Sequence, residues 1–274
     1  MSLSALRQLL DFAGMAQRWF QRCCGLLGYA TGGVVTPLLI LFCSGASSAF
    51  SLDAPVAAGG SAVAVSVDVA CMLLFGLQHS AMARPAVKRF VSERLGADLE
   101  RSCYVLMACA SLLLLMLAWR PLPQVLWSLP AWRVWFQVGF VLGTLGVYAA
   151  AFALNHAELL GLPQAWFGSG LPGIQPNCLR VSGPYRLVRH PLMTGLLLVF
   201  WSTWQMTLGH ALFALGMTVY VFVGTHFEEV RLARQFGQAY EEYRARTGMF
   251  LPRLLGPRPL REPRPEQHER LTNG

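Results

Sequence analysis

Basic and aromatic polar side chains gather in a motif near the C-terminus. Gly183-Pro184-Tyr185-Arg186 is followed by Arg189-His190-Pro191 and then by an uncharged stretch, 191–225. Proline suits the first turn of a helix, so a helix that begins near His190 directs free N–H groups and a partial positive charge toward this motif. With Arg189 beside it, the motif predicts a corner that binds a carboxylate or a phosphate.

A second motif supplies hydrogen-bond acceptors. Glu228 and Glu229 follow the apolar stretch, where a membrane boundary is expected. Their carboxylates would accept hydrogen bonds from the hydroxyl or ammonium groups of a cofactor. The two motifs together predict a polar site held against a membrane face. The candidate cofactor-binding residues are Tyr185, Arg189, His190, His226, Glu228 and Glu229.

Another set of polar residues lies at the ends of apolar stretches in the first two thirds of the chain. Gln78-His79 and Asn155-His156 border segments in which an unpartnered polar group costs several kcal/mol. We therefore expect them to meet partners or a ligand. His79 and His156 are candidate general bases, and the alternative for each is a structural histidine that bridges two helices. The histidines are single and lack ligand spacing, so no metal site is predicted.

The composition places these residues in a membrane protein. Of 274 residues 54% are hydrophobic and 13% are charged, against about a quarter charged in soluble domains. A spanning helix needs about 20 apolar residues. The candidates are 26–50, 61–82, 102–119, 134–154 and two short spans within 191–225, separated by a tight turn at Leu208-Gly209-His210. The sequence predicts an all-α, polytopic transmembrane helical bundle of about six spans, the last two a hairpin, and leaves five or six open.

Basic residues indicate the orientation of the bundle. The connections 83–101 and 155–190 and both terminal segments are rich in arginine, whereas 51–60 and 206–209 contain neither lysine nor arginine. Both termini and the cofactor pocket are therefore predicted on the cytoplasmic side. The basic residues are spread among loops, so the net charge of +8 does not predict nucleic-acid binding.

The remaining sequence predicts one membrane domain over 1–252, which begins with an interfacial amphipathic helix within 1–25, and a mobile cytoplasmic tail over 253–274. Asp68 stands in the middle of the second apolar stretch. An intramembrane carboxylate is a functional candidate, and the alternative is a structural acid that helps to pack helices.

The C-terminal motifs resemble those of a known family. Gly-Pro-Tyr-Arg-x-x-Arg-His-Pro-x-x-x-Gly over 183–195, Glu-Glu-x-x-Leu over 228–232 and Tyr240-x-x-Tyr243 resemble the isoprenylcysteine carboxyl methyltransferase-like integral membrane methyltransferases. In the first part of the chain, Phe-Gly-Leu-Gln-His-Ser over 75–80, Glu-Arg-Ser-x-Tyr over 100–104 and Asn-His-x-Glu-Leu-x-Gly over 155–161 resemble the bacterial methanethiol S-methyltransferases. The chain departs from that pattern at Ala157 and Glu158, where a bulky residue such as Phe and an Asp are typical.

The resemblance implies an enzyme of the bacterial inner membrane that transfers a methyl group from S-adenosyl-L-methionine to a small thiol, converting methanethiol to dimethyl sulfide. It implies that the C-terminal motifs hold the cofactor. Because such a thiol is apolar and volatile, we expect it to reach the site through membrane lipid. The catalytic candidates are then His79, held by its neighbour Gln78, and His156, held by its neighbour Asn155. Ser80, Tyr104 and Glu158 are the candidate substrate contacts.

Three other functions are compatible with the same motifs. A methyltransferase of prenylated cysteine carboxylates or lipid amines would use the same C-terminal half. A sterol-type membrane reductase would bind NADPH instead of S-adenosylmethionine. A non-enzymatic accessory protein of nitrite or nitric oxide reductases would need no pairing of the Arg-His-Pro and Glu-Glu motifs. Binding of S-adenosylhomocysteine or NADPH distinguishes the first two classes.

Overall fold

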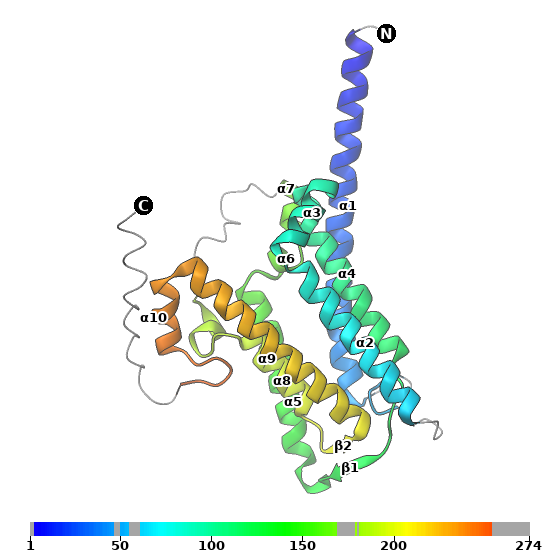
Figure 1. Cartoon of the computed structure of the whole chain (residues 1–274), viewed down its shortest axis with the longest axis vertical. Helices are drawn as coiled ribbons and strands as arrows, with labels where there is room; N and C mark the ends of the chain where they lie inside the picture. The colour runs from blue at the N-terminus through cyan, green and yellow to red at the C-terminus, as the bar shows by residue number, and fades with distance from the viewer. Residues whose placement is uncertain (1–2, 47–49, 55–60, 169–178, 180, 254–274) are drawn as a thin grey trace.

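The fold is described from a computed structural model that places residues 3–46, 50–54, 61–168, 179 and 181–253. Figure 1 shows two groups of helices that meet near the β-strands and diverge toward the opposite end of the bundle. The predicted tail lies almost wholly outside the described residues. In chain order the elements are α1 Leu3–Ser44, α2 Ser61–Met82, α3 Pro85–Leu95, α4 Ala97–Ala118, β1 Val125–Ser128, η1 Pro130–Trp132, α5 Arg133–Ala153, α6 His156–Leu159, α7 Leu162–Phe167, η2 Gly183–Arg186, α8 Pro191–Trp201, β2 Gln205–Thr207, α9 Leu208–Phe236 and α10 Gln238–Arg246.

The prediction of an all-α polytopic bundle is confirmed. Five of the described helices contain apolar segments long enough to cross a membrane: Gly14–Ser44, Ala62–Met82, Ala97–Ala118, Pro130–Ala153 and Leu208–Phe236. The sixth apolar helix, α8, has only 11 residues, which at 1.5 Å per residue cover roughly half of the hydrocarbon thickness. The last hairpin therefore pairs a short helix with a long one.

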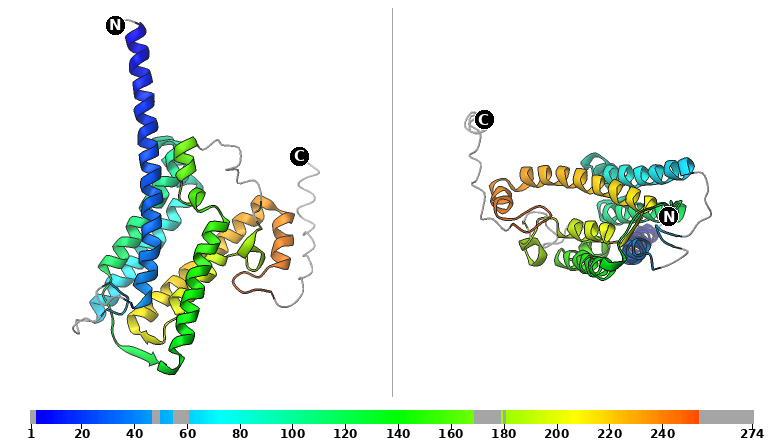
Figure 2. Two further views of the ribbon diagram at one scale, coloured as in Figure 1. Left: turned by 180° about the vertical axis from the view of Figure 1, so that it is seen from behind. Right: turned by 90° about the horizontal axis from the view of Figure 1, so that it is seen from below.

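The prediction of a separate interfacial helix before the first span is wrong. The helix α1 runs without a break for 42 residues and extends beyond the other helices in both side views (Figures 1 and 2). Gly25 and Gly32 do not interrupt it, because their bare faces receive Ala165 of α7 and Leu160, the residue after α6. These glycines serve close helix packing instead of a turn.

The predicted turn at Leu208-Gly209-His210 is also misplaced. These residues form the first turn of α9, where the Thr207 side chain caps the helix by accepting the His210 N–H at 3.0 Å. The chain reverses earlier, in residues 202–207, and β2 pairs there with β1 in an antiparallel ribbon. A threonine N-cap accepts a hydrogen bond from a free N–H group at the start of a helix. This cap stabilises a helical conformation at Gly209, although glycine also favours turns.

Aromatic side chains join the two groups of helices at the β-strand end. Phe213 of α9 lies at the centre, with its ring centroid 6.1 Å from Phe42, 5.7 Å from Trp119 and 5.2 Å from Phe200. Phe42, Phe200 and Phe213 are almost fully buried. Edge-to-face aromatic contacts of this kind add about 0.5–1.5 kcal/mol each beyond the burial of area. The polar residues of interest lie toward the other end.

The helices α5 and α8 pack backbone to backbone. A Cβ atom added at Gly195 would lie 2.7 Å from the carbonyl oxygen of Gly143 and 2.7 Å from the nitrogen of Val147. Only glycine allows this approach. The last glycine of the Arg-His-Pro motif thus fixes α8 against α5 and sets the position of the polar residues before α8.

Asp68 and His210 belong to the β-strand end of the bundle. Asp68 is fully buried, and its Oδ1 accepts the backbone N–H of Arg120, just after α4, at 2.8 Å. The His210 ring lies between Asp53, 2.9 Å from Nδ1, and the carbonyl of Phe200, 2.9 Å from Nε2. Both residues fasten chain segments where helices end, which favours the structural alternative for Asp68.

Candidate functional site

The first part of the candidate site is centred on His79, near the C-terminal end of α2. Its Nε2 lies 2.7 Å from the hydroxyl of Tyr104 on α4. The rings of Phe75 and Tyr220 lie 5.4 and 6.2 Å from the His79 ring, centroid to centroid. The other ring nitrogen, Nδ1, is buried and has no hydrogen-bond partner among the described residues. A buried nitrogen of this kind is costly unless a ligand uses it.

Gln78 faces a different neighbour from His79, whereas Ser80 shares Tyr220 with it. The Gln78 Oε1 accepts from the hydroxyl of Ser111 on α4 at 2.9 Å, and its buried Nε2 has no partner in the described part of the chain. Ser80 hydrogen bonds the phenol of Tyr220 on α9. Adjacent residues on a helix point about 100° apart, so the expectation that Gln78 holds His79 is wrong, and Tyr104 does so.

His156 lies in a separate group, between α1 and the turn after α5. Its Nε2 is 3.1 Å from the Tyr29 hydroxyl, and its ring packs against Phe152 with centroids 4.5 Å apart. Asn155 donates to Glu158 at 3.1 Å. The expectation that Asn155 holds His156 is therefore wrong. Asn155 has a positive φ of 65°, which turns the chain into α6 and directs its side chain away from the His156 ring.

Arg101 connects this turn to the His79 group. Its Nε donates to the carbonyl of Leu159 at 2.8 Å, and its guanidinium carbon lies 5.0 Å from the centroid of the Tyr104 ring. Gly161, with φ of 85°, lets the turn approach α4, since a Cβ there would lie 3.1 Å from Arg101 Cγ. The motif over 155–161 thus supplies a carbonyl that orients an arginine on α4.

The second part of the candidate site surrounds Glu229 on α9. Arg189 forms a two-pronged ion pair with it, Nε to Oε1 at 2.8 Å and Nη2 to Oε2 at 2.9 Å. His190 Nε2 and the Tyr240 hydroxyl also reach Oε1, at 2.8 and 2.7 Å. Arg189, His190 and Glu229 are all buried. Arg189 and Glu229 therefore hold each other, and the Arg-His-Pro and Glu-Glu motifs meet in space.

The chain after α10 returns to close this group. Gly248 and Met249 offer their carbonyls to the N–H groups of Arg189 and His190 at 2.8 and 3.1 Å. The outer nitrogen Nη1 of Arg189 also donates to the carbonyl of Thr247. This backbone pairing fixes the segment before α8 from two sides. It gives the residues that follow α10 a definite role in the site.

Two tyrosines complete the same group. The Tyr243 hydroxyl donates to the carbonyl of Tyr185 at 2.6 Å. Burial raises the pKa of Tyr243 to about 12, with Arg189 acting in the opposite direction. Burial, aided by the charge of Glu228, also raises the pKa of Tyr185. Both phenols therefore stay neutral in the physiological range, and that of Tyr243 serves as a hydrogen-bond donor.

Glu228 carries a charge that acts on residues of both parts of the site. Its side chain is 42% exposed, and its charged contacts among the described residues are long, 3.6 Å to His190 Nδ1 and 3.8 Å to Arg231. Its charge acts on Tyr104 of α4 and on Tyr185 of η2. Among the acidic residues of the motif, Glu228 is thus the one that remains available to a ligand. His226 is exposed and contacts the ring of Phe227.

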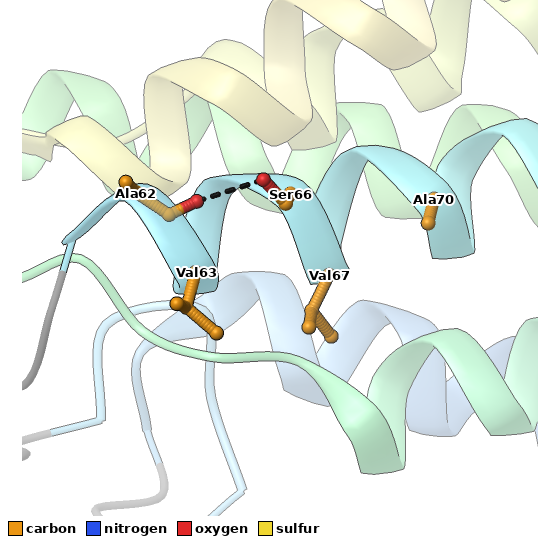
Figure 3. Close-up of a pocket in the computed structure, with 5 residues that line it drawn as sticks. All are labelled: Ala62, Val63, Ser66, Val67 and Ala70. Atoms are coloured by element: carbon orange, nitrogen blue, oxygen red, sulfur yellow. Dashed lines mark hydrogen bonds between the residues drawn. The ribbon is translucent and has the colours of Figure 1, made fainter.

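A shallow hollow elsewhere on the surface is not part of this site. Figure 3 shows that it lies along one face of the first turns of α2. Its only polar side chain is Ser66, whose hydroxyl donates to the carbonyl of Ala62 at 2.9 Å. The hollow offers no free polar group, and its apolar lining suits contact with lipid.

Comparisons with known proteins agree with the motifs. Methanethiol S-methyltransferase 2 of Bradyrhizobium diazoefficiens is 41% identical over 211 residues, which cover 73% of this chain and 82% of that protein. The methanethiol S-methyltransferase of Mycobacterium tuberculosis is 42% identical, with 69% of this chain and 78% of that protein covered. This chain belongs to the methanethiol S-methyltransferase family.

The chain also matches a further family model and a relative of another name. The sequence model described as NnrU protein matches residues 69–256, more than half of the chain. Nurim of Xenopus laevis is 32% identical over 57% of this chain and 58% of its own length. No solved structure matches the chain. The NnrU match includes the His79, Arg101 and Glu229 groups and leaves out α1.

Some residues of this family member's site were not recognisable as such from sequence. Tyr220 is the single tyrosine of the uncharged stretch, and its pairing with α2 shows its place. Tyr29 and Ser111 likewise resemble ordinary residues of apolar helices. Tyr240 was signalled by the Tyr-x-x-Tyr spacing but not by its bond to Glu229. These contacts depend on which helices are neighbours, and a single sequence does not contain that information.

Proposed function

We propose that this protein methylates a small thiol with S-adenosyl-L-methionine, converting methanethiol to dimethyl sulfide. Relatives that share about two fifths of their residues with this chain are named methanethiol S-methyltransferases. The observation that carries the proposal in this chain is the buried, unpartnered Nδ1 of His79, held by Tyr104 through the other ring nitrogen. Such a nitrogen is suited to take the proton of a thiol.

The residues on either side of α9 fit the chemical groups of S-adenosylmethionine. Glu228 is half-exposed, and its carboxylate can accept from ribose hydroxyls or an ammonium group. Tyr185 offers an aromatic face beside it, suited to adenine or to a sulfonium. The positions of Glu228 and Tyr185 are fixed by the contacts among Arg189, His190 and Glu229, which hold η2 and α8 against α9. The cofactor would thus be held by the C-terminal motifs, without a Rossmann sheet.

When bound, the cofactor supplies an electrophilic methyl group: a bond forms between the thiol sulfur and the methyl carbon as the carbon–sulfonium bond breaks, and its electron pair stays on the departing sulfur. The role of the protein is alignment and proton removal. If the Nε2–H of His79 donates to the Tyr104 oxygen, Nδ1 carries a lone pair and accepts the S–H proton. The proton leaves the thiol for His79, and charge is balanced.

The membrane setting suits an apolar, volatile substrate. We place the arginine-rich end, with both termini, in the cytoplasm of a bacterial cell, so that the charged cofactor enters from water. The thiol partitions into lipid and approaches between the helices. Bulky replacements at a lipid-side entry would raise the Michaelis constant for thiol and leave cofactor affinity unchanged.

The deciding experiment is headspace detection of dimethyl sulfide from purified protein given methanethiol and S-adenosylmethionine. We expect product from the wild-type protein, a loss of roughly 100-fold or more in His79→Ala, and a smaller loss in His156→Ala. A prenylated cysteine offered in parallel tests the related carboxyl methyltransferase activity. Binding of NADPH in place of S-adenosylhomocysteine, or no product under any condition, would refute the proposal.

A further inference from the structure

The outer end of the Arg101 guanidinium has no hydrogen-bond or ion-pair partner among the described residues. Its Nε is bonded to the carbonyl of Leu159, whereas its outer nitrogens Nη1 and Nη2 make no hydrogen bond or ion pair with any residue that the structure describes. The neighbouring acid, Glu100, contacts Lys88 at 3.7 Å instead. The outer nitrogens are also absent from the buried unpartnered atoms of the described chain, so the end of the guanidinium is open to a ligand.

The position of this guanidinium is fixed by its surroundings. The Leu159 carbonyl holds Nε at 2.8 Å, and the Tyr104 ring lies under the guanidinium at 5.0 Å. Since Tyr104 bonds His79 at 2.7 Å, the three side chains form a continuous row from α4 to α2. The charge of Arg101 acts on the His79 ring. With Nε occupied, the free Nη1–Nη2 edge presents two parallel N–H donors, the geometry that matches a carboxylate.

Arg189, the arginine of the C-terminal motif, differs in this respect. Its Nε and Nη2 bind Glu229 and its Nη1 donates to backbone carbonyls. A carboxylate ligand would have to displace Glu229 from Arg189, whereas at Arg101 it displaces nothing that the structure describes. Arg101 is therefore the better anchor for a carboxylate near His79.

We propose that Arg101 binds the carboxylate of the amino-acid end of S-adenosylmethionine. This inference rests on the proposed function and assigns one residue of its cofactor site. It places the amino-acid end of the cofactor beside Tyr104, so that the sulfonium a few bonds away lies toward His79, where the thiol loses its proton. It also gives the motif over 155–161 a purpose, since its Leu159 carbonyl and Gly161 orient Arg101.

The test compares S-adenosylhomocysteine with its decarboxylated analogue, each titrated calorimetrically into purified protein in lipid nanodiscs. The wild-type protein should bind the carboxylated ligand roughly 10- to 150-fold more tightly, the range for hydrogen bonds to charged groups. Arg101→Gln should lower this ratio to about threefold or less, and Arg101→Lys should give an intermediate value. Arg94→Gln is the matched control, because Arg94 also lies over an aromatic ring, Phe90, at 5.1 Å but on the exposed helix α3. It should keep the wild-type ratio.

The possible outcomes separate the two proposals. A wild-type ratio near one, or an unchanged ratio in Arg101→Gln, overturns the role of Arg101 even if dimethyl sulfide is produced. A changed Michaelis constant for thiol with an unchanged ratio would assign Arg101 to the thiolate and also overturn it. If the wild-type protein binds neither ligand, the proposed function fails and the inference fails with it. The affinity ratio of the wild-type protein is measured without any variant. The proposal can therefore be refuted even if Arg101→Gln folds poorly.

Discussion

Replacing Glu229 by glutamine should destabilise the protein before any ligand is added. The carboxylate receives two hydrogen bonds from Arg189 and one each from His190 and Tyr240, at 2.7–2.9 Å. The side chains of Arg189 and Glu229 are only 7% and 6% exposed. Removing one partner of such a buried pair leaves an uncompensated charge and costs about 3–5 kcal/mol. We therefore expect Glu229→Gln to lower the free energy of unfolding by about that amount.

The assay is unfolding in mixed micelles titrated with dodecyl sulfate, followed by tryptophan fluorescence, without cofactor or thiol. Glu241→Gln is the control, because Glu241 is exposed and contacts only Arg244 among ionised partners of the described chain, at 3.4 Å. An exposed pair of this kind contributes about 0–1 kcal/mol. The double variant Arg189→Met/Glu229→Gln should lose less than the sum of the two single variants, by about 1–3 kcal/mol.

Two results would refute this reasoning. If Glu229→Gln is as stable as Glu241→Gln, the pair does not hold α8 against α9. If stability is unchanged but affinity for S-adenosylhomocysteine falls, Glu229 contacts the ligand directly, as the sequence motif alone suggests. Additive losses in the double variant would show that the two side chains do not act as a pair.

Three further predictions follow from the site and its frame. His79→Gln should reduce dimethyl sulfide formation by about 100-fold or more with normal binding of S-adenosylhomocysteine, measured by headspace analysis and calorimetry; equal loss of binding would contradict its role as base. Burial raises the Tyr243 pKa from 10.0 to about 12, so the folded state holds this proton more tightly, and its stabilising effect is present below pH 10 and lost as pH rises through 12. The unfolding temperature should therefore drop over this interval, by less in Tyr243→Phe, and an equal drop in both proteins would count against it. Gly195→Leu should overpack the α5–α8 contact and lower stability by about 1–3 kcal/mol or more, whereas Gly33→Leu, where an added Cβ meets nothing within 4 Å, should be nearly neutral.

The sequence predicted the helices and the grouping of motifs better than the pairing of side chains. Apolar length located the four long helices before α8, because the hydrocarbon thickness sets that length, but it divided 191–225 into two short spans and missed the 29-residue length of α9. The meeting of the Arg-His-Pro and Glu-Glu motifs also followed from a hairpin whose two ends return to the same side. Arg189 and Glu229 do meet, at 2.8 Å. What they bind could not be predicted, because two opposite charges at one place satisfy each other as readily as a ligand.

The wrong predictions have a common physical origin: each relied on residues adjacent in sequence, whereas the observed contacts depend on how the helices pack. Amphipathic composition suggested a separate helix within 1–25, yet α1 runs without a break, and Gly25 and Gly32 lie where neighbouring segments approach it. Gln78 and Asn155 were assigned to the histidines beside them in sequence, although adjacent positions on a helix face different neighbours. Tyr104 and Tyr29, which hold those histidines, are 25 and 127 residues away along the chain. Such contacts require the arrangement of the helices.

The shortness of α8 explains why the β-strands exist. The Trp201 indole donates to Thr218 at 2.9 Å, so α8 ends well within the length of α9, and extended chain must cover the remaining distance. Backbone that is not helical survives at membrane depth only if protein satisfies its polar groups. That requirement is met by β1, which pairs with residues 205–207, and by the Leu129 N–H, which donates to the carbonyl of Trp204 at 2.9 Å.

The same shortness determines the depth of the polar site. Because α8 begins beside the last third of α9, Arg189 and His190 face Glu229 across the hairpin instead of lying in a loop beyond it. Buried ionisable and backbone groups need internal partners, and the backbone that returns after α10 provides some of them. In the proposed function, this frame presents the cofactor to the thiol. If α8 were extended to a full span, the Arg-His-Pro motif would move away from Glu229 and the frame would be lost.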